Sequence, residues 1–148
     1  MFQVRIYLLM LSKYPRKSKG YFGYRLETID KQGRVHEKTV YDEEEDITAN
    51  QLALVAMYRA FEELKSPCEV EVFTDSLYLR GNFVSNMQNW TLHSWMNSKG
   101  EPVANGDLWR KLEQITEQHV VRFNTEYQWP ARGRMTRELM ERKERHVG

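Results

Sequence analysis

Residues 69–80 place the strongest constraint on what this chain can fold into. Their sequence is Glu-Val-Glu-Val-Phe-Thr-Asp-Ser-Leu-Tyr-Leu-Arg. Alternation of β-branched and aromatic residues predicts a strand up to Thr74. Asp75 and Ser76 then supply side chains that are favoured at a helix N-cap. In open α/β sheets, ligands bind beyond the carboxyl ends of the strands. Asp75 is therefore either a cap alone or a functional carboxylate.

Length and composition are those of a globular chain. The sequence has 148 residues, of which 41% are hydrophobic and 29% charged. We expect a single domain over residues 1–148, and no apolar run approaches the length of a membrane span, which predicts no membrane partner. The one cysteine, Cys68, cannot form an internal disulfide. Together with the lack of a cleavable leader pattern, this favours a cytoplasmic location.

The charges are clustered although their sum is only +1. An acidic block occupies residues 42–46, and a basic cluster consists of Lys13, Arg16, Lys17 and Lys19. A C-terminal basic cluster contains Arg132, Arg134, Arg137, Arg142, Lys143 and Arg145. Such runs are commonly solvated surface. They also permit a locally positive groove in a chain of almost no net charge.

The predicted elements alternate between strands and helices in a way that defines the fold class. Three strands, at 4–11, 21–29 and 34–41, are followed by a helix at 49–65 with Thr48 as its N-cap. The later elements are a strand at 69–74, helices at 76–81 and 82–90, a helix at 108–117 capped by Asp107, a strand at 119–124 and a last helix at about 134–145. An antiparallel meander followed by crossovers predicts an α/β fold with a five-stranded mixed sheet flanked by helices.

Four motifs carry a family resemblance. They are the segment Phe-Thr-Asp-Ser-Leu-Tyr-Leu-Arg at 73–80, Thr-Ala-Asn-Gln-Leu-Ala-Leu at 48–54, a tryptophan-rich stretch that ends in Asp-Leu-Trp at 107–109, and Arg-Glu-Leu at 137–139. Together with the element order, they resemble the type 1 ribonuclease H family. The resemblance implies a ribonuclease H-like fold and, in active members, Mg²⁺-dependent hydrolysis of the RNA strand of an RNA–DNA hybrid.

The resemblance also identifies positions where the catalytic chemistry is missing. Two Mg²⁺ ions need hard oxygen ligands to stabilise the attacking and leaving oxygens. The family supplies them from four acidic positions, which correspond here to Leu9, Ala53, Asp75 and Arg137. Only Asp75 is an acid. We therefore expect no metal and no cofactor, with Mg²⁺ at Asp75 only if the site is active.

Arg137 adds a positive charge where the family has a metal ligand. A guanidinium does not lose its proton. At about 4 Å from a divalent ion it would be repelled by roughly 8 kcal/mol at an effective dielectric near 20. We hypothesise that Arg137 instead forms an ion pair with Asp75, in place of the metal ions.

Several residues are candidates for contacts to nucleic acid. The resemblance implies such a role for Thr48 and Asn50, which precede or open the first long helix, and for Trp109. Thr48 is also explained as an N-cap alone, and Trp109 as a core residue. The basic cluster and Arg137 could supply phosphate contacts, and their alternative role is solvated surface.

Three functions therefore stay open. The first is a catalytically inactive ribonuclease H-like domain that binds an RNA–DNA hybrid or duplex through backbone and shape contacts. The second is a protein-interaction module on a vestigial fold, which Leu9, Ala53 and the acidic block favour. The third is an active enzyme in which Asp46 and Glu138 replace the missing acids.

Overall fold

The computed structural model describes residues 1–11, 15–126 and 128–147. It contains a sheet of five strands and five helices among these residues. The strands are β1 (Phe2–Met10), β2 (Ser18–Ile29), β3 (Val35–Ile47), β4 (Cys68–Phe73) and β5 (Val120–Asn124). The helices are α1 (Ala49–Glu62), α2 (Leu77–Ser85), α3 (Met87–Leu92), α4 (Gly106–Thr116) and α5 (Arg132–Val147). Among the described residues, no helix has the length and apolarity that crossing a bilayer requires.

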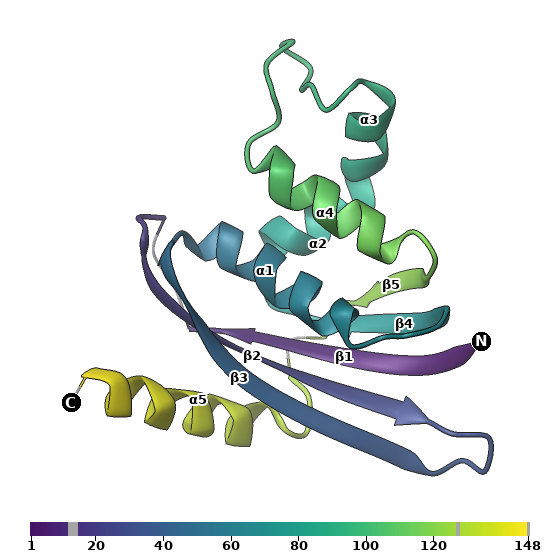
Figure 1. The fold of residues 1–148 in the computed structure, drawn as a ribbon, viewed down its shortest axis with the longest axis vertical. Coiled ribbons are helices and arrows are strands. Elements are labelled where there is room, and N and C mark those ends of the chain that lie inside the picture. The colour runs from purple at the N-terminus through teal and green to yellow at the C-terminus, as the bar shows by residue number, and fades with distance from the viewer. Residues whose placement is uncertain (12–14, 127, 148) are drawn as a thin grey trace.

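The sheet is mixed, with the order β3-β2-β1-β4-β5. Antiparallel pairs join β1 to β2 and β2 to β3, whereas β4 lies parallel to both β1 and β5. Figure 1 shows α1, α2 and α4 on one face of the sheet and α5 on the other. The predicted fold class is therefore confirmed, including the antiparallel arrangement of the first three strands.

The main core lies between the sheet and α1. Side chains alternate along a strand, and in β1 Ile6 and Leu8 point toward α1 and are fully buried. Leu52, Ala56 and Ala60 recur along the facing side of α1 and are also inaccessible to solvent. This spacing follows the period of an α-helix, so that one apolar stripe covers the sheet.

A second apolar cluster lies under α5. It joins sheet residues to the two side chains that α5 buries completely, Met135 and Leu139. The cluster consists of Tyr7, Leu9, Tyr21, Phe73, Trp129, Met135 and Leu139. Gly23, which pairs with Leu9 in the sheet, leaves room for the Tyr41 ring, because a Cβ atom there would lie 2.7 Å from Tyr41 Cδ1. The last helix, α5, thus covers the apolar side chains of this cluster.

Several element boundaries differ from prediction. The third strand continues from the expected end at 41 to Ile47, so the acidic block is part of β3 rather than a connection. Three of its carboxylates, those of Asp42, Glu43 and Glu45, pair with cations of neighbouring elements, which reduces the repulsion between adjacent acids. The last helix is longer than predicted and begins at Arg132. The division between α2 and α3 falls at Asn86, and Asp107 lies in the first turn of α4, whose N-cap position is Asn105.

His119 makes the fold sensitive to acid. Its Nδ1 atom accepts a hydrogen bond of 3.0 Å from the backbone N–H of Cys68, and its side chain is buried. Burial lowers the pKa of His119 below its ordinary value. The unfolded chain therefore binds a proton at a higher pH than the folded chain does. The stability that His119 contributes is present above its unfolded pKa of about 6.5 and is lost as the pH falls through the lower folded pKa.

We therefore expect the free energy of unfolding to fall between about pH 7 and about pH 5, in part through His119. Urea denaturation at both pH values measures this. His119→Asn retains an acceptor near the Nδ1 position and should reduce the difference between the two pH values. The matched substitution of an exposed histidine, His93→Asn, should leave it unchanged. Equal pH dependence in His119→Asn and the wild-type protein would contradict this explanation.

Candidate functional site

Asp75 lies in the connection between β4 and α2, at the carboxyl end of a central strand. It is not the N-cap of α2. Ser76 takes that position, and its Oγ atom accepts a hydrogen bond of 3.1 Å from the backbone N–H of Leu79. The Asp75 side chain is 42% exposed. Ser76 thus caps the helix, and the Asp75 carboxylate remains available for other contacts.

The partner of Asp75 is Arg132, the first residue of α5. Arg132 Nη2 donates a hydrogen bond of 3.0 Å to Asp75 Oδ2. The same guanidinium lies over the Trp129 ring, with its Cζ atom 5.6 Å from the ring centroid. The hypothesis that Arg137 pairs with Asp75 is therefore wrong. Arg137 lies more than one helical turn further along α5, and its side chain is exposed.

Sequence reasoning missed Arg132 as a site residue. It was one member of the C-terminal basic cluster, and no motif distinguished it from its neighbours. Whether Arg132 reaches Asp75 depends on where the chain returns to the sheet after β5. Arg132 N–H donates to the Trp129 carbonyl, and Trp129 is itself buried against the sheet, which places the start of α5 beside the end of β4. That is a tertiary effect that local sequence does not encode.

Leu9 is buried in the cluster under α5. Its side chain is 3% exposed and shares that cluster with Tyr7, Phe73 and Trp129. The Tyr7 ring stacks on Phe73 with centroids 4.6 Å apart and lies 5.4 Å from the centroid of Trp129. The position at which the resemblance implies a catalytic acid is therefore part of an apolar and aromatic packing arrangement.

Ala53 is also a core residue. It lies on α1, is 1% exposed and belongs to the main core. The position offers neither a ligand atom nor a polar contact. Leu9 and Ala53, at two positions where the resemblance implies metal ligands, thus contribute to apolar packing.

The residues present do not fit a two-metal site. Mg²⁺ sites in proteins are built from several oxygen ligands. Within the described parts of the chain, no three histidine, cysteine, aspartate or glutamate side chains are close enough to hold a metal ion. The proposed replacement acids are separated by the fold: Asp46 lies in edge strand β3, and Glu138 lies on α5, where it pairs with Arg134 at 3.7 Å.

Thr48 and Asn50 lie at the N-terminus of α1. Thr48 Oγ1 accepts a hydrogen bond of 3.1 Å from Gln51 N–H, and the backbone N–H of Thr48 donates one of 3.1 Å to Gln51 Oε1. This is a capping box, so the predicted N-cap is confirmed. Asn50 is exposed beside it. The cap fixes the orientation of the helix start from which Asn50 projects.

Trp109 is a core residue rather than an open groove residue. It has no exposed surface, and its Nε1 atom donates a hydrogen bond of 2.9 Å to the Tyr78 hydroxyl. Asn105 Nδ2 donates to the same hydroxyl at 3.0 Å, and Gln51 Nε2 donates to Asn105 Oδ1 at 3.2 Å. This chain of hydrogen bonds links α2 and α4 to the N-terminus of α1. Sequence reasoning missed Tyr78 and Asn105 because only the packing of the helices brings them together.

Only part of the basic cluster lies in a loop. Lys13 falls outside the described residues. Arg16 and Lys17 are exposed and precede β2, whereas Lys19 lies within β2. Lys19 Nζ is 3.3 Å from Glu45 Oε1, so one cation of the cluster is paired with the acidic block.

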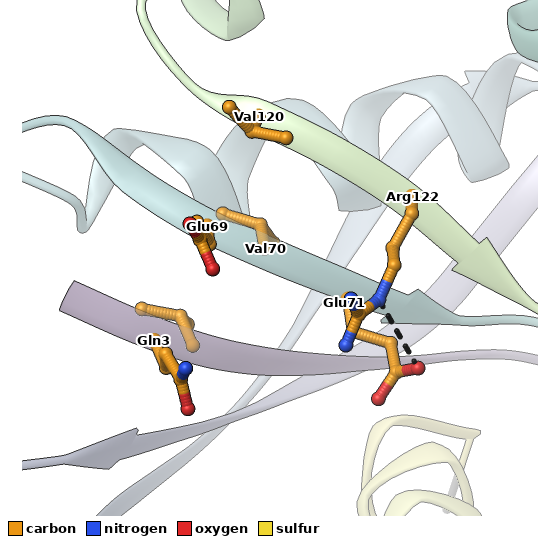
Figure 2. A pocket seen from close by; sticks show the side chains of 7 residues that line it. Gln3, Glu69, Val70, Glu71, Val120 and Arg122 are labelled. Carbon is orange, nitrogen blue, oxygen red and sulfur yellow. Dashed lines mark ion pairs between the residues drawn. The ribbon is translucent and has the colours of Figure 1, made fainter. Parts of the chain in front are cut away.

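A shallow pocket lies on the part of the sheet toward the beginning of β4. Its volume is about 120 Å³, and its lining includes Gln3, Glu69, Glu71, Val120 and Arg122. Figure 2 shows Arg122 reaching over Glu71, with Arg122 Nε 3.5 Å from Glu71 Oε2. None of the predicted site residues lines this pocket. Asp75 follows the other end of β4, so this pocket is separate from the candidate site.

A match to a protein-family model shows which family this chain belongs to. The model of the RNase H family matches residues 12–125, which is most of the chain. The chain belongs to the RNase H family. The predicted family resemblance is thereby confirmed.

Curated relatives of this RNase H family member are named ribonuclease H. One from Nitrosococcus oceani is 41% identical over 92 residues, which cover 62% of this chain and 61% of the relative. Another from Hahella chejuensis is 42% identical over 84 residues, or 57% of each chain. The matched part thus spans about three fifths of the length of these relatives.

Solved structures confirm the fold. The crystal structure of LC9-RNase H1, a type 1 RNase H with the type 2 active-site motif, has a TM-score of 0.70 at 22% identity, covering 82% of this chain and 61% of that chain. A foamy viral protease-reverse transcriptase in complex with an RNA/DNA hybrid has a TM-score of 0.61 at 12% identity, covering 83% of this chain and 17% of that chain.

Proposed function

We propose that this chain is a ribonuclease H-like domain that binds an RNA–DNA hybrid or duplex without cleaving it. The observation that supports the absence of cleavage most directly is the ion pair between Asp75 and Arg132, with Nη2 and Oδ2 3.0 Å apart. A bound metal ion would have to displace a guanidinium from the only acid retained at the family's positions. Buried Leu9 and Ala53 offer no further ligand.

Nucleic-acid binding is supported by the family and by exposed polar and basic side chains. Curated relatives are named ribonuclease H, and one structure with this fold is in complex with an RNA/DNA hybrid. Here, Asn50, Arg16 and Lys17 are exposed, and Arg137 projects from α5. Contacts from such residues to phosphates depend on backbone shape rather than base sequence. The fold thus provides binding groups although the metal ligands are missing.

Fluorescence anisotropy of a labelled RNA–DNA hybrid tests the binding. If roughly six phosphates are neutralised, affinity should fall about a thousandfold between 50 and 200 mM salt. Arg16→Ala/Lys17→Ala should weaken binding and reduce this salt dependence. The control Lys31→Ala/Lys65→Ala removes the same charge from exposed positions at the far ends of β2 and α1 and should bind like the wild-type protein.

Two outcomes would contradict this proposal. A lack of binding at the lower salt concentration would exclude the nucleic-acid role and favour a protein-interaction module. Loss of the hybrid in the presence of Mg²⁺ would show that the domain is an active ribonuclease H. The double variant Arg132→Ala/Asp75→Asn removes one positive and one negative charge. It then shows whether Arg132 also holds the nucleic acid, because only that role lowers affinity at unchanged net charge.

A further inference from the structure

The acidic block of β3 makes ion pairs with both basic clusters. Glu43 Oε2 accepts a hydrogen bond of 2.6 Å from Arg142 Nε of α5, and Asp42 Oδ1 lies 3.8 Å from Arg142 Nη2. Glu45 Oε1 lies 3.3 Å from Lys19 Nζ. Two cations that belong to clusters predicted to contact nucleic acid are therefore engaged within the protein.

The acidic block also connects the helices on the two faces of the sheet. Asp42 Oδ2 accepts a hydrogen bond of 2.9 Å from Arg59 Nη2 of α1, while its other oxygen faces Arg142 of α5. Figure 1 shows β3 between these helices, with α1 and α5 on opposite sides of it. Burial opposes ionisation of Asp42, but the Glu43 backbone N–H and Arg59 outweigh it and keep the pKa of Asp42 below its ordinary value. Asp42 is thus charged at neutral pH.

Arg142 and Lys19 differ in how strongly their carboxylate partners hold them. The side chains of Arg142 and Glu43 are 29% and 21% exposed, so solvent and salt screen their attraction only in part. The bond to Glu43 raises the pKa of Arg142. The Lys19–Glu45 pair is more exposed, at 36% and 76%, and exchanges its partners more readily.

We propose that Glu43 and Glu45 lower the affinity of this domain for nucleic acid by occupying Arg142 and Lys19 in internal ion pairs. The inference rests on the proposed function, since it concerns nucleic-acid binding by the same domain. A phosphate backbone must displace a carboxylate from each cation before it gains the contact. Each contact that is not gained also releases no counterions, so the two pairs reduce the salt dependence of binding.

Glu43→Gln/Glu45→Gln tests this role. Glutamine keeps a hydrogen-bond acceptor at each position and removes the charge. We expect the affinity for an RNA–DNA hybrid to rise about tenfold, and the slope of log affinity against log salt to steepen by about two, because two cations become available to phosphates. Thermal unfolding of the variant shows whether the fold is retained.

Two controls separate local masking from overall charge. Glu101→Gln/Glu117→Gln removes the same charge from exposed acids that form no ion pair within the described residues, and should leave affinity unchanged. In a Lys19→Ala/Arg142→Ala background, the glutamine substitutions should no longer raise affinity. An equal gain in the Glu101 control, or a gain that persists without Lys19 and Arg142, would overturn the inference.

The outcomes also separate this inference from the proposed function. Binding by the wild-type protein with no change in Glu43→Gln/Glu45→Gln would overturn the masking role alone. No binding by either protein would overturn both. Binding that is weak in the wild-type protein and strong in the variant would support masking directly.

Discussion

Replacing Leu9 by aspartate is expected to destabilise the fold by about 4 kcal/mol or more and to restore no cleavage. Leu9 is 3% exposed among Tyr7, Trp129, Met135 and other apolar side chains. The substitution loses the packing of leucine and places a carboxylate in an apolar cluster. Because domains of this size have net stabilities of roughly 5–15 kcal/mol, the substitution removes a large share of the total. Urea denaturation measures the loss.

Leu9→Met is the matched control for this substitution. It conserves volume and polarity and should cost less than about 1.5 kcal/mol. If Leu9→Asp were as stable as Leu9→Met, the position would have to face water or a compensating cation, and the apolar cluster under α5 would be described wrongly. Mg²⁺-dependent cleavage by Leu9→Asp would contradict the second part of this prediction, because adding one acid at position 9 would then be enough to restore catalysis.

Trp109→Ala is expected to cost about 3–5 kcal/mol in the free energy of unfolding. Trp109 is fully buried, its ring centroid lies 5.4 Å from that of Trp90, and its Nε1 atom donates to Tyr78. Truncation leaves a large cavity beside Trp90 and Tyr78 and removes the hydrogen bond that links α4 to α2. Thermal or urea unfolding measures this loss.

Tyr78→Phe isolates the hydrogen bonds from the packing around Trp109. It removes only the hydroxyl, which leaves Trp109 Nε1 and Asn105 Nδ2 without that acceptor. We expect a cost of about 1–3 kcal/mol. A loss in Trp109→Ala no larger than in Tyr78→Phe would mean that the indole contributes little packing, contrary to its complete burial.

The fold was largely predictable because its signals are local. The strand at 69–74 and the helix capped by Thr48 have clear periodicity and capping residues, and both occur where expected. The end of the third strand was predicted too early, at residue 41, because the partners of the acidic block are not visible in the local sequence. Arg59 and Arg142, which neutralise Asp42 and Glu43, come from distant parts of the chain.

The candidate site was predictable only in part. The exposure of Asp75 and the burial of Leu9 follow from strand position and apolarity, which sequence carries. The choice of Arg132 over Arg137 as the partner of Asp75 does not, because it depends on where α5 begins and how Trp129 packs. Successive residues on a helix point about 100° apart. An arginine a few residues from the correct one therefore faces a different part of the protein.

The proposed function requires that the domain binds nucleic acid without metal ligands, and the packing at the candidate site is consistent with this requirement. Arg132 supplies positive charge beside Asp75, and Leu9 and Ala53 are buried apolar residues at positions where the resemblance implies acids. Apolar replacement of buried charges is often neutral or stabilising. Apolar side chains at these positions therefore carry no necessary cost to the fold.

The most direct test of this account measures binding and cleavage on one hybrid with a labelled RNA strand. Saturating protein is incubated with it in millimolar Mg²⁺, anisotropy records binding, and a denaturing gel records the length of the RNA. We predict salt-sensitive binding and RNA of unchanged length. RNA fragments that appear with Mg²⁺ and disappear in Asp75→Asn would contradict the central claim, because Asp75 would then be serving a metal rather than Arg132.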